Sequence, residues 1–346
     1  MNLSSLNSTE SGNSRIGIFG LPVCDLEEAR LVILPVPWEA TVVYGSGTAR
    51  AAEPVVKTSL LINLFNPDFQ NSWQKGFHIM DVDKKVLTKS DYLRKEAELV
   101  TDYITHGDDV SKNSFMGKSI ADINQGGEFL NNWVHERTGN LLKAGKLAVV
   151  LGGDNSVSFG YIKALAENNE SFGILQIDAQ CGLRKAYHGF VYSHVSTMYN
   201  VINEIPQVAR VVQLGARDFC EEEWRFIQEH KDKICMFSNK TLQDRMLEGV
   251  TWQSISDEII TQLPQKVYIS FDIDGLDPKY CPSTAMPVPG GLETAHIFYL
   301  IKKLAAEGKK IIGLDLTGVG SDTPTDASVG ARVLWRLCNW LILSNN

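Results

Sequence analysis

The chain has 346 residues, of which 44% are hydrophobic and 21% are charged, a composition typical of a folded globular protein. Its formal net charge of −8 argues against nucleic-acid binding. No apolar run approaches the ~20 residues that a membrane helix needs, and residues 1–15 lack the features of a signal peptide. The six cysteines are scattered without a CxxC pair, which predicts free thiols. We therefore expect a cytoplasmic protein with no nucleic-acid or membrane partner.

The N-terminal part predicts one strand and three helices. Residues 1–29 are polar and are expected to form a tail, and residues 30–346 a single domain. The apolar run Leu31–Pro35, ended by prolines, predicts a buried strand, and a glycine loop follows at residues 44–48. Helices are expected at Ala49–Leu64, at Ser90–Thr105 with Ser90 as N-cap, and at Glu128–Ala144, with a loop at 106–118.

The C-terminal part alternates short apolar strands with helices. Strands are expected at Leu147–Leu151, Phe172–Ile177, Val211–Leu214, Ile234–Phe237, Val267–Phe271 and Ile311–Leu316. Helices are expected after residue 156 through Asn168, and at Val195–Ile205, Glu221–His230, Ser256–Thr261, His296–Glu307 and Val329–Leu343. This alternation predicts an α/β fold with a parallel sheet covered on both faces.

Three of the predicted strands end in segments that carry aspartates. These segments read LGGDNS (151–156), QIDAQCG (176–182) and SFDIDGLDP (270–278). The carboxyl ends of parallel strands meet at one edge of a sheet, where α/β proteins place their ligand sites. Clustered carboxylates bind a cation, become protonated or find a basic partner such as Arg184 or Lys185. A single aspartate more often caps a helix or turn, but three such strand ends together favour a cation site.

The same segments resemble those of the ureohydrolase family, which comprises arginases, agmatinases and related guanidino-group hydrolases. LPVPWEATVVYGSGTARAAEPV (34–55) resembles the agmatinase entry segment. LGGDNS resembles the family's GGDHS, IDAQCG resembles DAHxD, and SFDIDGLDP resembles SFDxDxxDP. The resemblance runs from about residue 30 to the C-terminus. It implies a three-layer α/β/α sandwich with a central, mostly parallel sheet of about eight strands.

The resemblance also implies a metal centre, at which this chain departs from the family. Asp178, Asp272 and Asp274 keep the aspartate ligands of the family. Two imidazole ligands are replaced, by Asn155 and Gln180, and a third position that the family fills with aspartate is Gly182, so one of the two metal positions is dismantled. The other position retains the three aspartates and Gln180. These are hard oxygen ligands suited to one Mg²⁺, Ca²⁺ or Mn²⁺, and we expect no dinuclear manganese centre.

Two further positions bear on catalysis. Where the family commonly has a glutamate that anchors the substrate guanidinium, this chain has Gly318. The resemblance implies a histidine that shuttles protons, and spacing from the DAQCG segment favours His194, with His188 as the second choice. The alternative is that either histidine is a hydrogen-bonded loop residue, an interpretation that fits His188 better than His194.

These departures lead to two alternative functions. The first is a ureohydrolase-fold protein without a complete dinuclear centre, inactive or impaired, that acts as a binding, regulatory or structural subunit. The alternative is a metal-dependent hydrolase of a guanidino or amidino C–N bond that uses one metal or an unusual ligand set. Partners would be a guanidino or amidino small molecule and further copies of the chain in a trimer or hexamer, or an active relative. The last helix, with Trp335 and Trp340, is expected to be the subunit contact unless both face their own sheet.

Overall fold

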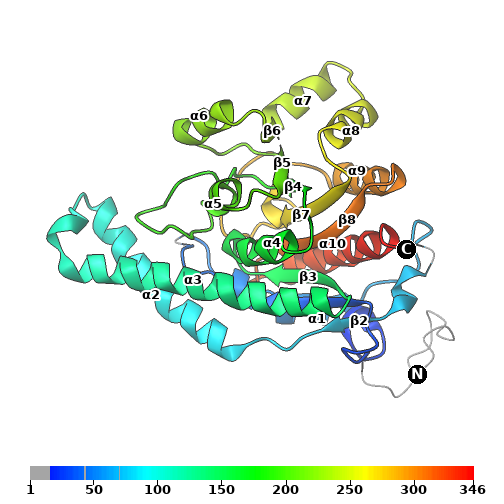
Figure 1. The fold of residues 1–346 in the computed structure, drawn as a ribbon, viewed down its shortest axis with the longest axis horizontal. Helices are drawn as coiled ribbons and strands as arrows, with labels where there is room; N and C mark the ends of the chain where they lie inside the picture. The colour runs from blue at the N-terminus through cyan, green and yellow to red at the C-terminus, as the bar shows by residue number, and fades with distance from the viewer. Residues whose placement is uncertain (1–15, 43, 70) are drawn as a thin grey trace.

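The fold is a parallel sheet of eight strands enclosed by helices (Figure 1), seen in a computed structural model that describes residues 16–42, 44–69 and 71–346. The strands are β1 (Leu31–Val36), β2 (Phe77–Ile79), β3 (Leu147–Gly152), β4 (Phe172–Ile177), β5 (Val208–Leu214), β6 (Ile234–Phe237), β7 (Lys266–Asp272) and β8 (Lys310–Thr317). Their order is β2-β1-β3-β8-β7-β4-β5-β6, and every neighbouring pair is parallel. The predicted three-layer α/β architecture is confirmed.

Ten α-helices alternate with these strands along the described part of the chain. They are α1 (Ala52–Ser59), α2 (Lys84–Thr105), α3 (Ser114–Lys143), α4 (Ser158–Ala166), α5 (Thr197–Glu204), α6 (Glu221–Glu229), α7 (Asn239–Leu247), α8 (Trp252–Thr261), α9 (Thr294–Ala306) and α10 (Pro324–Leu343). Short 3-10 helices lie at Ile18–Gly20, Thr48–Arg50, Ser72–Lys75, Val110–Lys112, Asn155–Val157 and Ile273–Gly275. None of the helices in these ranges is long and apolar enough to cross a membrane.

The sheet separates two hydrophobic cores because successive side chains of a strand point to opposite faces. In β1, Leu31 and Ile33 join one core, and Val32 and Leu34 join the other. The first core is covered by α1, α8, α9 and α10, and the second by α2, α3, α4 and α5 (Figure 1). Strands β1, β3 and β4 are buried along their whole length, and β7 and β8 are buried except at their first residue. This explains their continuous apolar runs.

Several predicted helix boundaries are wrong, because side-chain caps set the true ones. α2 begins at Lys84, since the Asp83 carboxylate accepts hydrogen bonds from the backbone N–H groups of the next turn. The predicted cap, Ser90, lies inside this helix, and its hydroxyl accepts a hydrogen bond from the Glu39 backbone N–H. Asn113 caps α3 in the same way within the segment expected to be a loop. α1 is shorter than predicted and ends at Ser59.

Three other regions differ from the sequence analysis. β2 and α7 were not predicted, because β2 has three residues and α7 buries only Leu242. Part of the expected N-terminal tail, residues 16–29, contributes buried side chains such as Phe19 to the domain, whereas residues 1–15 lie outside the described residues. All six cysteines are free thiols, as predicted.

The tryptophans of α10 pack inside their own chain. Trp335 is 4% exposed and Trp340 is 8% exposed. The Trp335 ring lies 4.9 Å from the ring of Phe19 and 5.8 Å from that of Phe77, and the Trp340 ring lies 5.4 Å from that of Phe69. The prediction that these tryptophans form a subunit contact is therefore wrong. Oligomerisation itself stays a prediction.

Candidate functional site

The aspartate-bearing segments meet at the carboxyl edge of the sheet. β3, β8, β7 and β4 are consecutive in the sheet, so the residues that follow them lie side by side. This places Asn155 after β3, Asp178 after β4, and Asp272 and Asp274 at the end of β7. The structure thus brings together these four of the predicted metal-ligating residues, and Gln180 lies two residues beyond Asp178.

Asp178 is held by amide groups on both carboxylate oxygens. Its Oδ2 accepts hydrogen bonds from Asn155 Nδ2 at 2.8 Å and from Gln176 Nε2 at 3.0 Å, and its Oδ1 accepts one from the Gln180 backbone N–H at 2.7 Å. Gln176 is oriented in turn by Gln213, whose Nε2 donates to Gln176 Oε1 at 2.8 Å. A relay of neutral amides therefore fixes the central carboxyl group of the site.

A second bridge links β3 to β7 through the end of β8. The Thr317 hydroxyl lies 2.8 Å from Asn155 Oδ1 and 3.1 Å from Asp272 Oδ2. Asp272 Oδ1 accepts a hydrogen bond from the Asp274 backbone N–H at 2.9 Å, and Asp274 Oδ1 accepts one from the Ala179 backbone N–H at 3.0 Å. Asn155 is thus hydrogen-bonded at both ends of its side-chain amide, to Asp178 and to Thr317.

The three carboxyl groups are buried beside one another, which favours their neutral forms. Burial, reinforced by the charge of Asp272, raises the pKa of Asp178 to about 8. Burial and the charge of Asp178 raise the pKa of Asp274 to about 8, and burial with Asp274 raises the pKa of Asp272 well above its usual range. The nearby basic group is Arg217, whose Nη2 donates to the Asp274 backbone carbonyl at 2.7 Å. The sequence analysis had suggested Arg184 or Lys185 as the basic partner of these carboxyl groups.

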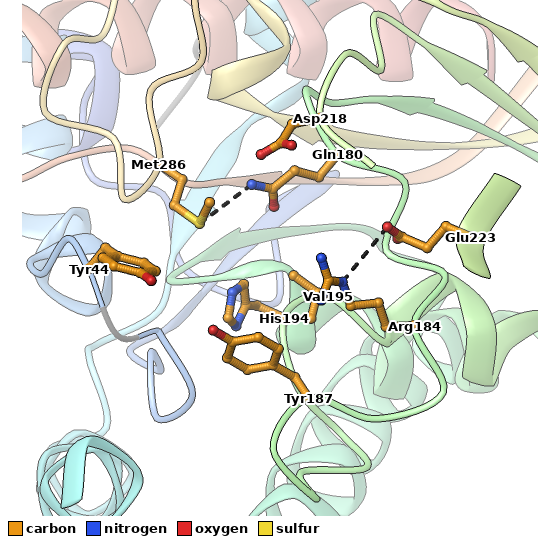
Figure 2. Close-up of a pocket in the computed structure, with 9 residues that line it drawn as sticks. All are labelled: Tyr44, Gln180, Arg184, Tyr187, His194, Val195, Asp218, Glu223 and Met286. Atoms are coloured by element: carbon orange, nitrogen blue, oxygen red, sulfur yellow. Dashed lines mark hydrogen bonds and ion pairs between the residues drawn. The ribbon is translucent and has the colours of Figure 1, made fainter. Parts of the chain in front are cut away.

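Two contiguous cavities open above these carboxyl groups. The inner cavity, about 30 Å³, is bordered by acidic and small residues: Asp154, Asn155, Asp272, Asp274, Thr284 and Gly318 among others. The outer cavity, about 240 Å³, is lined by Tyr44, Gln180, Arg184, Tyr187, His194, Val195, Asp218, Glu223 and Met286 (Figure 2). Gln180, His194 and Met286 line both cavities, so together they form one pocket with an acidic floor.

Of the two predicted catalytic histidines, only His194 faces this pocket. Its Nδ1 lies 3.0 Å from the Thr41 hydroxyl, and its ring lies 6.0 Å from the ring of Tyr187 (Figure 2). Burial, helped by the charge of Arg184, lowers the pKa of His194 to about 4, so the imidazole is neutral at pH 7. The His188 ring lies 4.1 Å from the ring of Tyr187, and His188 does not line either cavity.

The glycine loop at residues 44–48 forms part of the pocket wall because a buried ion pair holds it. Glu39 accepts hydrogen bonds from the backbone N–H groups of Gly47 (2.9 Å) and Ala49 (3.2 Å). Arg94 pairs with Glu39 at 3.0 Å and donates to the Gly45 carbonyl at 2.9 Å. Through these contacts α2 positions the loop that carries Tyr44 beside the outer cavity.

The described residues do not fit a two-metal centre. Gly182 has no side chain to offer a ligand, and the amide of Asn155 is already engaged with Asp178 and Thr317. The Gln180 side-chain amide donates to Met286 Sδ at 3.6 Å. No group of three or more His, Cys, Asp or Glu side chains in the described ranges is arranged to hold a metal ion. Binding of one cation by the aspartates stays a prediction.

Several residues of the candidate site were not identified by the sequence analysis. Thr317 is the last residue of a fourth strand, β8, so the rule that revealed the aspartates also pointed to it. Gln176 and Gln213 lie within strands β4 and β5, where a buried glutamine amid apolar residues signals a required hydrogen bond. Arg217 carries no such signal, because its partners are backbone carbonyl groups.

The chain is similar in sequence and in fold to known proteins of one family. Residues 29–339 match the model of the Arginase family. The N(1)-aminopropylagmatine ureohydrolase of Thermus thermophilus is 27% identical over 319 residues, which cover 92% of each chain. Among solved structures, the agmatine ureohydrolase of Thermoplasma volcanium is similar with a TM-score of 0.68, 19% identity and 92% of each chain covered. The proclavaminate amidino hydrolase of Streptomyces clavuligerus is similar with a TM-score of 0.70 and 17% identity, covering 96% of this chain and 98% of that one.

Proposed function

Because the chain belongs to the arginase family, we propose that its pocket binds a guanidino or amidino compound and does so without a two-metal centre. The observation that carries the proposal is the acidic floor of the pocket, where Asp272 and Asp274 border the inner cavity and Asp178 lies beside them. A planar cation forms parallel hydrogen bonds with carboxylates. Its charge also relieves the repulsion among these carboxyl groups and favours their ionised forms.

The binding role follows from the hydrogen bonds that hold the aspartates. Asn155 and Gln176 donate neutral amide hydrogen bonds to Asp178, and the Thr317 hydroxyl forms a hydrogen bond with Asp272, so the cluster is stabilised without a cation. In this role the chain acts as a binding, regulatory or structural subunit, alone, with further copies of itself or with an active relative.

Calorimetric titration of chelator-treated protein with arginine and citrulline tests the proposal. The two ligands differ in that citrulline carries a neutral ureido group in place of the guanidinium. We expect arginine or free guanidine to bind and citrulline to bind at least about tenfold more weakly, the difference made by one charge-assisted hydrogen-bonded pair. Asp274→Asn should weaken guanidine binding by a similar factor. Equal binding of arginine and citrulline would contradict the proposal.

The names of the relatives favour a second candidate, hydrolysis of an amidino C–N bond. The Thermus relative is named a ureohydrolase and the Streptomyces neighbour an amidino hydrolase. His194 supports this candidate because its neutral imidazole faces the cavity and can accept a proton, with Thr41 orienting the ring. Urea release from agmatine, arginine and guanidine, assayed with and without added Mn²⁺, separates the two candidates. Turnover at ordinary enzymatic rates that His194→Asn abolishes would establish hydrolysis.

A further inference from the structure

The outer cavity has a positive side chain whose role the acidic floor does not explain. Arg184 follows β4 in the same loop as Asp178 and reaches into the cavity beside Tyr187 and His194 (Figure 2). Of the described residues that line the two cavities, Arg184 is the one that carries a permanent positive charge. The pocket therefore has carboxyl groups at its floor, and its wall holds this guanidinium together with the carboxyl groups of Asp218 and Glu223.

The guanidinium of Arg184 is available to a ligand. Its side chain is 39% exposed, and its nitrogens donate no hydrogen bond to the described residues. Arg184 forms an ion pair with Glu223, but the 3.8 Å between Nε and Oε2 is too long for a hydrogen bond (Figure 2). The two carboxylate oxygens of Glu223 already accept hydrogen bonds from the backbone N–H groups of Leu183 and Cys220, at 3.0 Å each. A fork of N–H donors thus remains open toward the cavity.

We propose that Arg184 selects guanidino or amidino compounds that carry a carboxylate at their other end. This inference rests on the proposed function, since the acidic floor must receive the cationic end of the same molecule. An arginine side chain matches a carboxylate with two parallel hydrogen bonds, and its charge disfavours a second cation at the same place. A ligand with a cationic group at both ends, such as agmatine, would place a positive charge beside Arg184, and the two like charges would repel each other.

Asp218 also lines the outer cavity, and its carboxylate attracts a cationic group of a ligand, whereas Arg184 attracts an anionic one. It lies beside Gln180, away from Arg184, in Figure 2. An ammonium group on the ligand would therefore find a partner separate from Arg184. For this reason the test compares arginine with agmatine: both carry an ammonium group and a guanidinium, and they differ only by the carboxylate of arginine.

The experiment measures the dissociation constants of arginine and agmatine for the wild-type chain and for variants. We expect arginine to bind at least about tenfold more tightly than agmatine, as one bidentate charge-assisted pair provides. Arg184→Gln should reduce this ratio to about one by weakening arginine, while agmatine binds as well as before or better. Arg184→Lys, which keeps the charge and loses the fork, should retain part of the preference. Lys185→Gln is the matched control, because Lys185 is exposed in the same loop, and it should leave the ratio unchanged.

The outcomes separate this inference from the function on which it rests. If both ligands bind the wild-type chain with equal affinity, or agmatine binds more tightly, Arg184 does not select for a carboxylate, although the pocket still binds guanidino compounds. If the ratio persists in Arg184→Gln, and thermal unfolding shows that this variant is folded, another residue selects the carboxylate and the inference is wrong. If neither ligand nor free guanidine binds, the proposed function fails and the inference with it.

Discussion

Gly318, one of the positions at which the chain departs from the family, has no room for a side chain beside Asp272. It has φ of +73°, and a Cβ atom built on it would lie 2.2 Å from Asp272 Oδ1 and 2.7 Å from Asp272 Cγ. A larger side chain here must therefore displace the Asp272 carboxyl group. That movement breaks its hydrogen bonds to the Asp274 backbone N–H and to Thr317.

The cost of Gly318→Ala has two parts. The left-handed backbone conformation costs a residue with a Cβ about 1–2 kcal/mol. The two lost hydrogen bonds add about 1 kcal/mol each. We therefore expect Gly318→Ala to lower the free energy of unfolding by about 3–4 kcal/mol. Gly318→Glu would return the carboxylate found in the family, but its Cβ atom would clash with Asp272 in the same way. This substitution alone should therefore not restore a guanidinium anchor.

The matched control is Gly308→Ala. Gly308 has a similar φ of +80°, but nothing lies within 4 Å of the position that a Cβ atom would take, so only the backbone part of the cost applies. Urea unfolding of both variants gives the difference, which we expect to be about 2 kcal/mol. In an Asp272→Ala background, Gly318→Ala should cost no more than Gly308→Ala. Equal destabilisation by the two single substitutions in the wild-type chain would refute the reasoning.

Three further predictions concern the metal and the buried acids. Elemental analysis of protein purified with added Mn²⁺ should find fewer than two metal ions per chain, because Asn155, Gln180 and Gly182 supply no imidazole or carboxylate. The triple substitution Asn155→His, Gln180→His and Gly182→Asp should increase metal content in the same assay; unchanged content would argue against the ligand set implied by the resemblance. Burial raises the pKa of Asp315 from 3.8 to about 6, so its neutral form stabilises the fold fully below pH 3.8 and loses that contribution, about 3 kcal/mol, as the pH rises to 6. Asp315→Asn should reduce the loss of stability between pH 4 and pH 6 in urea unfolding curves by this amount, while the contributions of Asp178 and Asp274 remain.

The sheet and the position of the site were predictable because both depend on local sequence. Strands buried on both faces, such as β3 and β4, appear as unbroken apolar runs, and the rule for parallel sheets places the residues after them at one edge. α7 was not predictable in this way. Its sequence, NKTLQDRML, buries a single leucine, and Ser238 caps it from outside any apolar pattern.

The contacts within the site depend on residues far apart in the chain. Asn155 and Thr317 are 162 positions apart and meet only because β3 pairs with β8. The burial of Trp335 depends on Phe19, which lies in a segment whose polar start suggested a tail. Neither relationship leaves a periodic signal in the sequence, so only the packed structure reveals them.

Asn155 is more than the absence of a histidine ligand. If a metal-binding cluster had only lost its imidazoles, its buried aspartates would remain without partners and would repel one another. Here the Asn155 amide donates to Asp178 at one end and accepts from Thr317 at the other. Thr317 can make that bond while accepting a hydrogen bond from a protonated Asp272, which agrees with the raised pKa of this carboxyl group. A histidine introduced at position 155 must therefore first break this bridge, so metal binding by the triple variant competes with hydrogen bonds that already stabilise the site.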